Sequence, residues 1–252
     1  SGPVLAGFLI TRWGTGASIM LFAATNYWMA LMILFIRFRP EPRDPRDNRS
    51  FLTEIAGGFR YIAQTPSLRL LFMIAFTSGL LLRPYTELLP GFSGEVFGRG
   101  PEGLAALTAA AGFGALACGL LLVFRGRARG LVNIMLGGAV CGSVMLAVFA
   151  ATNTLNAGIA VLAVASFLML ACHVGAYSLI QNTTDAEMRG RVISVNVSIS
   201  IGAPALGALM IGWLAEAIGL QWAVAASALL ALVIMLVLLP SVRKQTAAME
   251  AE

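Results

Sequence analysis

Charged side chains inside apolar segments are the first candidates for function in this sequence. Arg83 and Glu87 stand four residues apart in one apolar run, and in a helix this spacing places both side chains on one face, where they can form an ion pair. If the run crosses a membrane from Leu68 at about 1.5 Å per residue, Glu87 reaches the outer interface and Arg83 is partly immersed. An interfacial structural pair and an extracellular gate both fit this placement.

His173 is the only histidine, and it also falls in an apolar run. An imidazole in such a place could carry protons or contact a substrate, or it could be a packed residue satisfied by a neighbouring hydroxyl or carbonyl group. Further polar side chains within or near the runs could line a cavity or join helices by hydrogen bonds. They are Asn26, Tyr177, Gln181 and Asn196.

No pattern in the sequence is typical of an enzyme or a metal site. There is no phosphate loop of the GxxxxGK type, no serine on a nucleophile turn and no metal-ligand spacing, and Cys118, Cys141 and Cys172 all lie in apolar runs. We therefore expect no catalytic residue, no metal and no cofactor.

The composition indicates that these residues are surrounded by lipid. Of 252 residues, 58% are hydrophobic and 12% charged, whereas a soluble domain needs more polar residues at its surface. Repeated apolar runs of about 20 residues can each cross a hydrocarbon core. The formal charge of +5 comes from arginine clusters between these runs, so nucleic-acid binding is not expected. The sequence predicts an all-α polytopic membrane protein.

About eight membrane helices are expected, the first of them incomplete. Residues 1–38 should form two helices around a tight turn at Gly14–Gly16, and residues 39–67 a linker that carries an amphipathic helix. Residues 68–240 should form a bundle of six spans, and residues 241–252 a polar tail. The expected spans are 68–89, closed by Pro90 and Gly91, then 104–124, 131–151, 155–180, 192–217 and 220–239.

Lysine and arginine are concentrated in every second connection between these runs. By the positive-inside rule, the linker, the loops near residues 127 and 190, and the C-terminus then face the cytoplasm. We expect a multi-pass protein of the bacterial inner membrane.

Residues 1–10 align without gaps with residues 202–211, and each segment precedes a glycine-containing turn and one more run. Two parallel bundles related by an axis along the membrane normal would produce such a repeat, although chance similarity between helices rich in small residues is an alternative. Under the repeat, residues 1–38 are the last two helices of a first bundle, and four helices precede Ser1.

Small residues and prolines in the repeat could let helices slide and break locally, or could serve ordinary tight packing. They are Gly2, Pro3, Gly7, Ala203, Pro204 and Gly207.

The segments Gly2–Gly7 (GPVLAG) and Glu187–Val192 (EMRGRV) resemble signatures of the major facilitator superfamily, the second one that of the efflux branch with enterobactin exporters. The resemblance implies helices five to twelve of this fold, with a truncated N-terminus and a complete C-terminal six-helix bundle. It also implies secondary active transport by alternating access.

The resemblance further suggests a cytoplasmic gate. The loop Arg125–Gly130 would match the second copy of a Gly-Asp-Arg-rich gating motif, without its aspartate. The four charges near residue 187 could form ion pairs that close the gate, or they could be solvated. The gate candidates are Arg125, Arg127, Arg129, Asp185, Glu187, Arg189 and Arg191.

Three functions are compatible with these features. The first is proton-linked export of small amphipathic molecules, such as drugs or siderophores, the second is solute uptake by the same architecture, and the third is a membrane scaffold or sensor without transport. The expected partners are a small-molecule substrate, protons, the lipid bilayer and the missing N-terminal helices, while the oligomeric state is open.

The arginine clusters make a testable prediction about topology. Cysteines introduced at Asp47 and at Gly98 should react with an impermeant thiol reagent from opposite sides of the membrane, Asp47 from the cytoplasm. Labelling of both positions from the same side would contradict the predicted topology.

Overall fold

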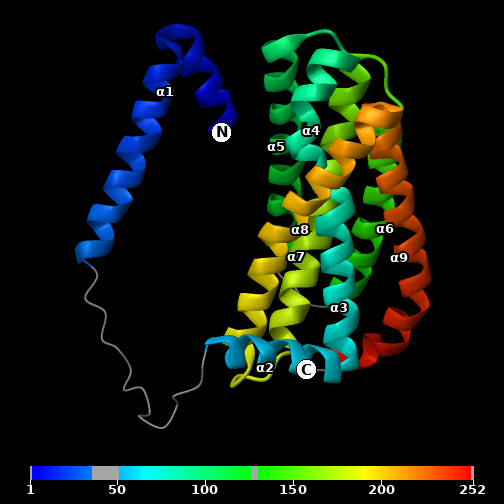
Figure 1. The fold of residues 1–252 in the computed structure, drawn as a ribbon. Helices are drawn as coiled ribbons and strands as arrows, with labels where there is room; N and C mark the ends of the chain where they lie inside the picture. The colour runs from blue at the N-terminus through cyan, green and yellow to red at the C-terminus, as the bar shows by residue number, and fades with distance from the viewer. Residues whose placement is uncertain (1, 36–50, 126–129, 251–252) are drawn as a thin grey trace. The chain divides into compact units, whose positions relative to one another are not determined.

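The computed structural model describes the backbone of residues 2–35, 51–125 and 130–250, and the chain divides into two compact units, the second of which starts at Leu52 in the sequence. Side chains are described for Gly16, for residues 19–35, 57–124 and 130–245. All regular elements of the described residues are helices (Figure 1), so the prediction of an all-α polytopic membrane protein is confirmed.

The first unit contains one helical run, α1 (Gly2–Phe35). Helical structure continues through the predicted turn at Gly14–Gly16, but Figure 1 shows the α1 run reversing its direction near its top, so the predicted hairpin is not contradicted and stays a prediction. A glycine costs a helix about 1 kcal/mol relative to alanine but keeps its backbone N–H, so it weakens a helix without ending it. The apolar side chains along Ile19–Phe35 are exposed within this unit.

The second unit begins at Leu52, within α2 (Phe51–Gln64), where the amphipathic helix was predicted. Its six membrane-capable segments among the described residues are Pro66–Val96, Gly100–Phe124, Leu131–Ala150, Leu155–Asn182, Arg189–Ile218 and Leu220–Gln245. The first consists of α3 (Pro66–Thr77), η1 (Ser78–Leu82), α4 (Tyr85–Gly91) and η2 (Phe92–Val96). The others are α5 (Gly100–Arg125), α6 (Leu131–Ala150), α7 (Leu155–Asn182), α8 (Arg189–Ile218) and α9 (Leu220–Glu250).

Two predicted helix ends at prolines were wrong. Pro90 lies inside α4, and the span continues to Val96. Pro240 lies inside α9, which runs on to Glu250, and Val242 beyond it is fully buried. Proline removes one backbone N–H, and a membrane helix tolerates this loss where its neighbours satisfy the freed carbonyl group.

The bundle has a buried core at each end. In one core, Leu68, Leu71 and Met135 pack with Ile62 of α2, which lies across this end of the bundle (Figure 1). In the other core, three phenylalanine rings form a cluster in which the Phe92 and Phe149 centroids are 4.8 Å apart. Between the two cores lie the polar side chains described below.

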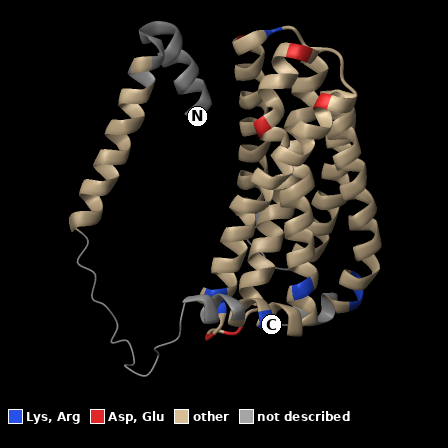
Figure 2. Cartoon of the chain, viewed as in Figure 1, with Lys and Arg blue, Asp and Glu red and all other residues tan. Residues whose placement is uncertain are grey.

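Charge is segregated between the two ends of the second unit. Figure 2 shows Lys and Arg mainly at the end where α2 lies, and Asp and Glu mainly at the opposite end. The antiparallel order of six spans also places the start of α3 and the end of α9 at the same end (Figure 1).

Glycines allow backbone contact between spans at a few positions. A Cβ on Gly138 of α6 would lie 2.5 Å from the Leu168 carbonyl oxygen of α7. A Cβ on Gly207 of α8 would collide with the Leu80 carbonyl oxygen of η1 and would lie 2.6 Å from Pro84 Cγ. Helices pack this closely in membranes only where side chains are absent or small.

The contact at Gly207 gives a prediction about stability. Gly207→Ala should destabilise the protein by about 1–3 kcal/mol, because η1 must move away from α8. Gly212→Ala is the matched control on the same helix, since a Cβ there has no atom within 4 Å, and it should be neutral or stabilising. Thermal unfolding of both variants in detergent checks this, and equal midpoints would show that the contact is not tight.

Candidate functional site

A cavity of about 260 Å³ lies inside the second unit. The spans that line it are Pro66–Val96, α5, α6, α7 and α8. Arg83, Thr86 and His173 line it and are themselves exposed, so the cavity opens at the surface of this unit. The residues that line it are Ala75, Ser78, Gly79, Leu82, Arg83, Tyr85, Thr86, Ala111, Ala115, Gly138, Ala139, Ser166, Met169, Leu170, Cys172, His173, Ala176, Tyr177, Asn196 and Ser200.

The span Pro66–Val96 forms the first wall of the cavity, and an irregular segment in its middle shapes this wall. The Arg83 N–H donates to the Ser78 carbonyl group at 2.9 Å, which is a bond across five residues and widens the helix at η1. Pro84 follows and has no N–H, so the Leu80 carbonyl group lacks its usual partner four residues on. The next bonds, from the Thr86 and Glu87 N–H groups, span only three residues.

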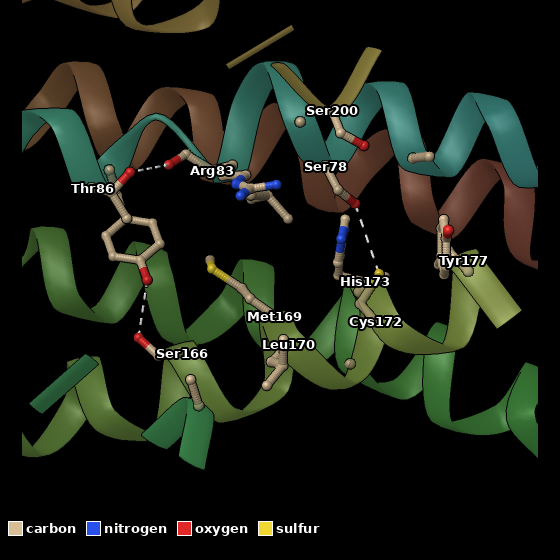
Figure 3. A pocket seen from close by; sticks show the side chains of 18 of the residues that line it. Ser78, Arg83, Thr86, Ser166, Met169, Leu170, Cys172, His173, Tyr177 and Ser200 are labelled. Atoms are coloured by element: carbon tan, nitrogen blue, oxygen red, sulfur yellow. Dashed lines mark hydrogen bonds between the residues drawn. The ribbon is translucent and has the colours of Figure 1, made fainter. Parts of the chain in front are cut away.

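Arg83 therefore lies where the helix changes from a wide to a tight turn. Figure 3 shows its side chain in the cavity, between Thr86 and Ser78 along its own span and across from Met169 and His173. Arg83 is the eighteenth of the 31 residues in this span, so it is near the middle of the membrane segment. The sequence had placed it nearer the outer interface, because the predicted span stopped too early, at Leu89.

The second wall is one face of α7. Ser166, Leu170, His173 and Tyr177 recur at intervals of three or four residues, and they line the cavity together with Met169 (Figure 3). This face combines hydroxyl, imidazole and phenol groups with flexible apolar side chains.

Hydrogen bonds join the two walls. The Tyr85 hydroxyl shares a hydrogen bond with Ser166 Oγ at 3.0 Å, and both side chains are buried. Further along the same two walls, Ser78 Oγ lies 3.8 Å from Cys172 Sγ, within reach of a weak hydrogen bond (Figure 3). These contacts fix the spacing between the irregular segment and α7.

On α8, Asn196 and Ser200 stand one turn apart and also line the cavity. Asn196 is 4% exposed as a residue, and its amide forms no hydrogen bond with any residue that the structure describes. The amide atoms of Asn196 are not among the buried polar atoms that lack a partner, so they face the cavity, where a ligand or water can bind them.

The cavity brings together some of the predicted site residues and leaves others apart. Arg83, His173, Tyr177 and Asn196 line it. Gln181 continues the same face of α7 one turn further but lies outside the cavity lining. Asn26 belongs to the first unit, where its amide donates to the Phe22 carbonyl group at 2.8 Å.

The predicted ion pair between Arg83 and Glu87 was wrong. The two side chains form no ion pair in the structure, and Glu87 does not line the cavity. The prediction assumed regular helical spacing, and the change from five-residue to three-residue bonds at Arg83 and Pro84 rotates the two side chains away from a common face.

The predicted packing motif on α8 contacts the irregular segment. A Cβ on Gly79 would lie 3.2 Å from Ala203 Cβ and 3.8 Å from Pro204 Cδ, one turn before the contact of Gly207 with Leu80. These residues hold η1 against α8, and a role in gating stays a prediction. The side chains of Pro3 and the other repeat residues of α1 lie outside the described set.

The gate candidates lie at the end of the bundle where α2 packs. Asp185 accepts a hydrogen bond from the Tyr61 hydroxyl of α2 at 2.7 Å, and a Cβ on Gly58 would lie 3.4 Å from the Arg191 carbonyl oxygen. Glu187 and Arg189 are exposed, and no ion pair joins the described residues of this group. Arg127 and Arg129 lie outside the described residues, as does the side chain of Arg125.

Several cavity residues were missed in the sequence: Ser78, Tyr85, Thr86, Ser166 and Ser200. Two signals could have found them. The polar residues of α7 follow one helical face, and Pro84 beside Arg83 marks a break in the hydrogen bonding of the span. Within the part of the chain that the structure describes, no cluster of metal-ligating residues occurs.

An all-helical bundle of membrane-spanning length, with an open cavity in mid-span, is the architecture of a polytopic membrane protein. The chain matches the family model of the Major Facilitator Superfamily over residues 1–200, and it therefore belongs to this superfamily of secondary transporters. This confirms the resemblance at the level of the superfamily, and the efflux branch stays a prediction. Comparison with curated proteins and with solved structures gives no match.

The bond between Tyr85 and Ser166 gives a prediction about the cavity walls. Tyr85→Phe and Ser166→Ala should each lower stability by about 0.5–1.5 kcal/mol, and the double variant should lose little more than either single one. Thermal unfolding of all four proteins completes the double-mutant cycle. Additive losses would show that the two hydroxyl groups do not interact.

Proposed function

We propose that the protein exports small amphipathic molecules by alternating access, driven by protons, and that the mid-span cavity is its half of the substrate site. The observation that carries this proposal is the open cavity at the middle of the membrane segment. Ligand sites typically combine apolar walls with a few convergent polar groups, and this lining does so.

The opening of the cavity supports a site completed by another bundle. Arg83 and His173 are exposed at mid-span, and a charged side chain that faced lipid at this depth would be strongly unfavourable. Water or protein must therefore cover the opening. The repeat between residues 1–10 and 202–211 favours a first bundle, of which α1 is the final part.

The segregation of charge supports an orientation with α2 and the C-terminus in the cytoplasm. His173 is the candidate for proton coupling, since among the residues that line the cavity it is the one whose ordinary pKa lies near neutrality. Export is favoured over uptake by the resemblance of the Glu187–Val192 segment to efflux transporters.

Flux in proteoliposomes tests the proposal. The full-length protein, in which the chain is extended by any upstream helices, should move an amphipathic probe when a proton gradient is imposed, and reversing the gradient should reverse the direction. The chain of 252 residues alone should show no flux, because alternating access needs two bundles around one site.

The controls separate the alternatives. Flux that ignores the gradient would contradict proton coupling, and flux only in the inward direction would favour an uptake facilitator. Absence of flux from the extended chain with any probe would favour a scaffold or sensor. Full flux from the 252-residue chain alone would contradict the two-bundle proposal.

A further inference from the structure

We infer that the cavity selects amphiphiles that carry an anionic group, bound by Arg83 together with Asn196 and His173, and that it discriminates against organic cations. This inference rests on the proposed function and specifies the substrate class of the same site.

The charges of the cavity lining carry the inference. Arg83 is its one permanently charged side chain among the described residues, and no aspartate or glutamate lines it. The nearest acid along the chain, Glu87, lies outside the lining and forms no ion pair with Arg83. The cavity is therefore electropositive, and an organic cation would find no counter-charge in it.

The depth of Arg83 strengthens this selectivity. It lies near the middle of a 31-residue span, where an unpaired guanidinium is unfavourable as soon as the cavity closes and water is excluded. A ligand that supplies the missing negative charge relieves this cost. A neutral ligand fills the same space without relieving it.

The hydrogen-bonding groups suit a planar anion. A guanidinium group presents a rigid fork of donors that matches a carboxylate or phosphate group. Asn196 lines the cavity, and its amide forms no hydrogen bond with a described residue, so its N–H can donate to the ligand as well. Figure 3 shows His173 and Arg83 entering the same space from opposite walls.

The remaining lining suits an apolar body. Met169 and Leu170 line the cavity from α7 and Leu82 from the first wall, and methionine adapts to ligands of different shape. A volume of about 260 Å³ lies just below the usual range for drug-sized ligands, so this half of the site fits one fused aromatic ring system.

Three naphthalene probes that differ in their head group test the inference. 1-Naphthylacetate is anionic, 2-(1-naphthyl)ethanol is neutral and 2-(1-naphthyl)ethylamine is cationic. Binding to the purified full-length protein, including any upstream helices, is measured by titration calorimetry. The acetate should bind at least about tenfold more tightly than the other two.

Variants assign this preference to the cavity. Arg83→Gln should weaken acetate binding about tenfold to a hundredfold and leave the alcohol unchanged. Arg69→Gln is the matched control, because Arg69 lies on the same span outside the cavity, and it should leave all three affinities unchanged.

Asn196→Asp places a carboxylate in the lining and should shift the preference toward the amine. If Arg83→Gln does not fold, Arg83→Lys takes its place. It keeps the charge without the planar fork, so it should retain only part of the preference.

Several results would overturn the inference. These are equal or tighter binding of the amine, an equal loss of all three probes in Arg83→Gln, and no binding of the acetate. Displacement of the acetate by phosphatidylglycerol but not by phosphatidylcholine would show a lipid-headgroup site instead. Proton-driven flux of the amine alone would overturn the anion preference and leave the transport function standing. Anion-selective binding without flux of any probe would leave the anion preference standing and overturn the proposed transport function.

Discussion

The contact between η1 and α8 is the constraint on which the candidate site depends. In lipid each backbone polar group needs a partner within the protein, and Pro84 deprives the Leu80 carbonyl group of its usual one. The span responds with a wide turn closed by the bond from Arg83 to Ser78. Gly207 leaves room for the Leu80 carbonyl group to approach α8, so the irregular turn is held by packing as well as by hydrogen bonds.

The other wall depends on a second set of close contacts. α7 packs most extensively against α6 and α5, and glycines make this possible: Gly138 meets the backbone of Leu168, and Gly114 meets that of Ala163. Because these contacts fix the rotation of α7, its polar face turns toward η1. The bond between Tyr85 and Ser166 then joins the two walls across the cavity. The site is thus placed by tight packing of small residues rather than by ion pairs.

The architecture could be predicted from the sequence, and the geometry of the site could not. Apolar runs and alternating arginine clusters indicate spans because the bilayer imposes a minimum length. The ends at Pro90 and Pro240 were wrong because hydropathy does not reveal which prolines a helix tolerates. Seven polar or charged residues in or near apolar runs were selected, and four of them, Arg83, His173, Tyr177 and Asn196, do meet in one cavity. The pairing of Arg83 with Glu87 failed because one irregular turn changes the register of every residue beyond it.

The unpaired cation also bears on how binding and movement could be linked under the proposed function. When the cavity is open, water can solvate the Arg83 side chain. Closing the empty cavity would remove this water and leave a buried charge without a partner, which is costly. An anionic ligand would remove that cost, so the closed state would be favoured only when substrate is bound. A ligand shifts a conformational equilibrium by its difference in affinity for the two states, and here this difference comes from the charge of the ligand. The feature that selects the substrate would therefore also disfavour closure, and hence slippage, without it.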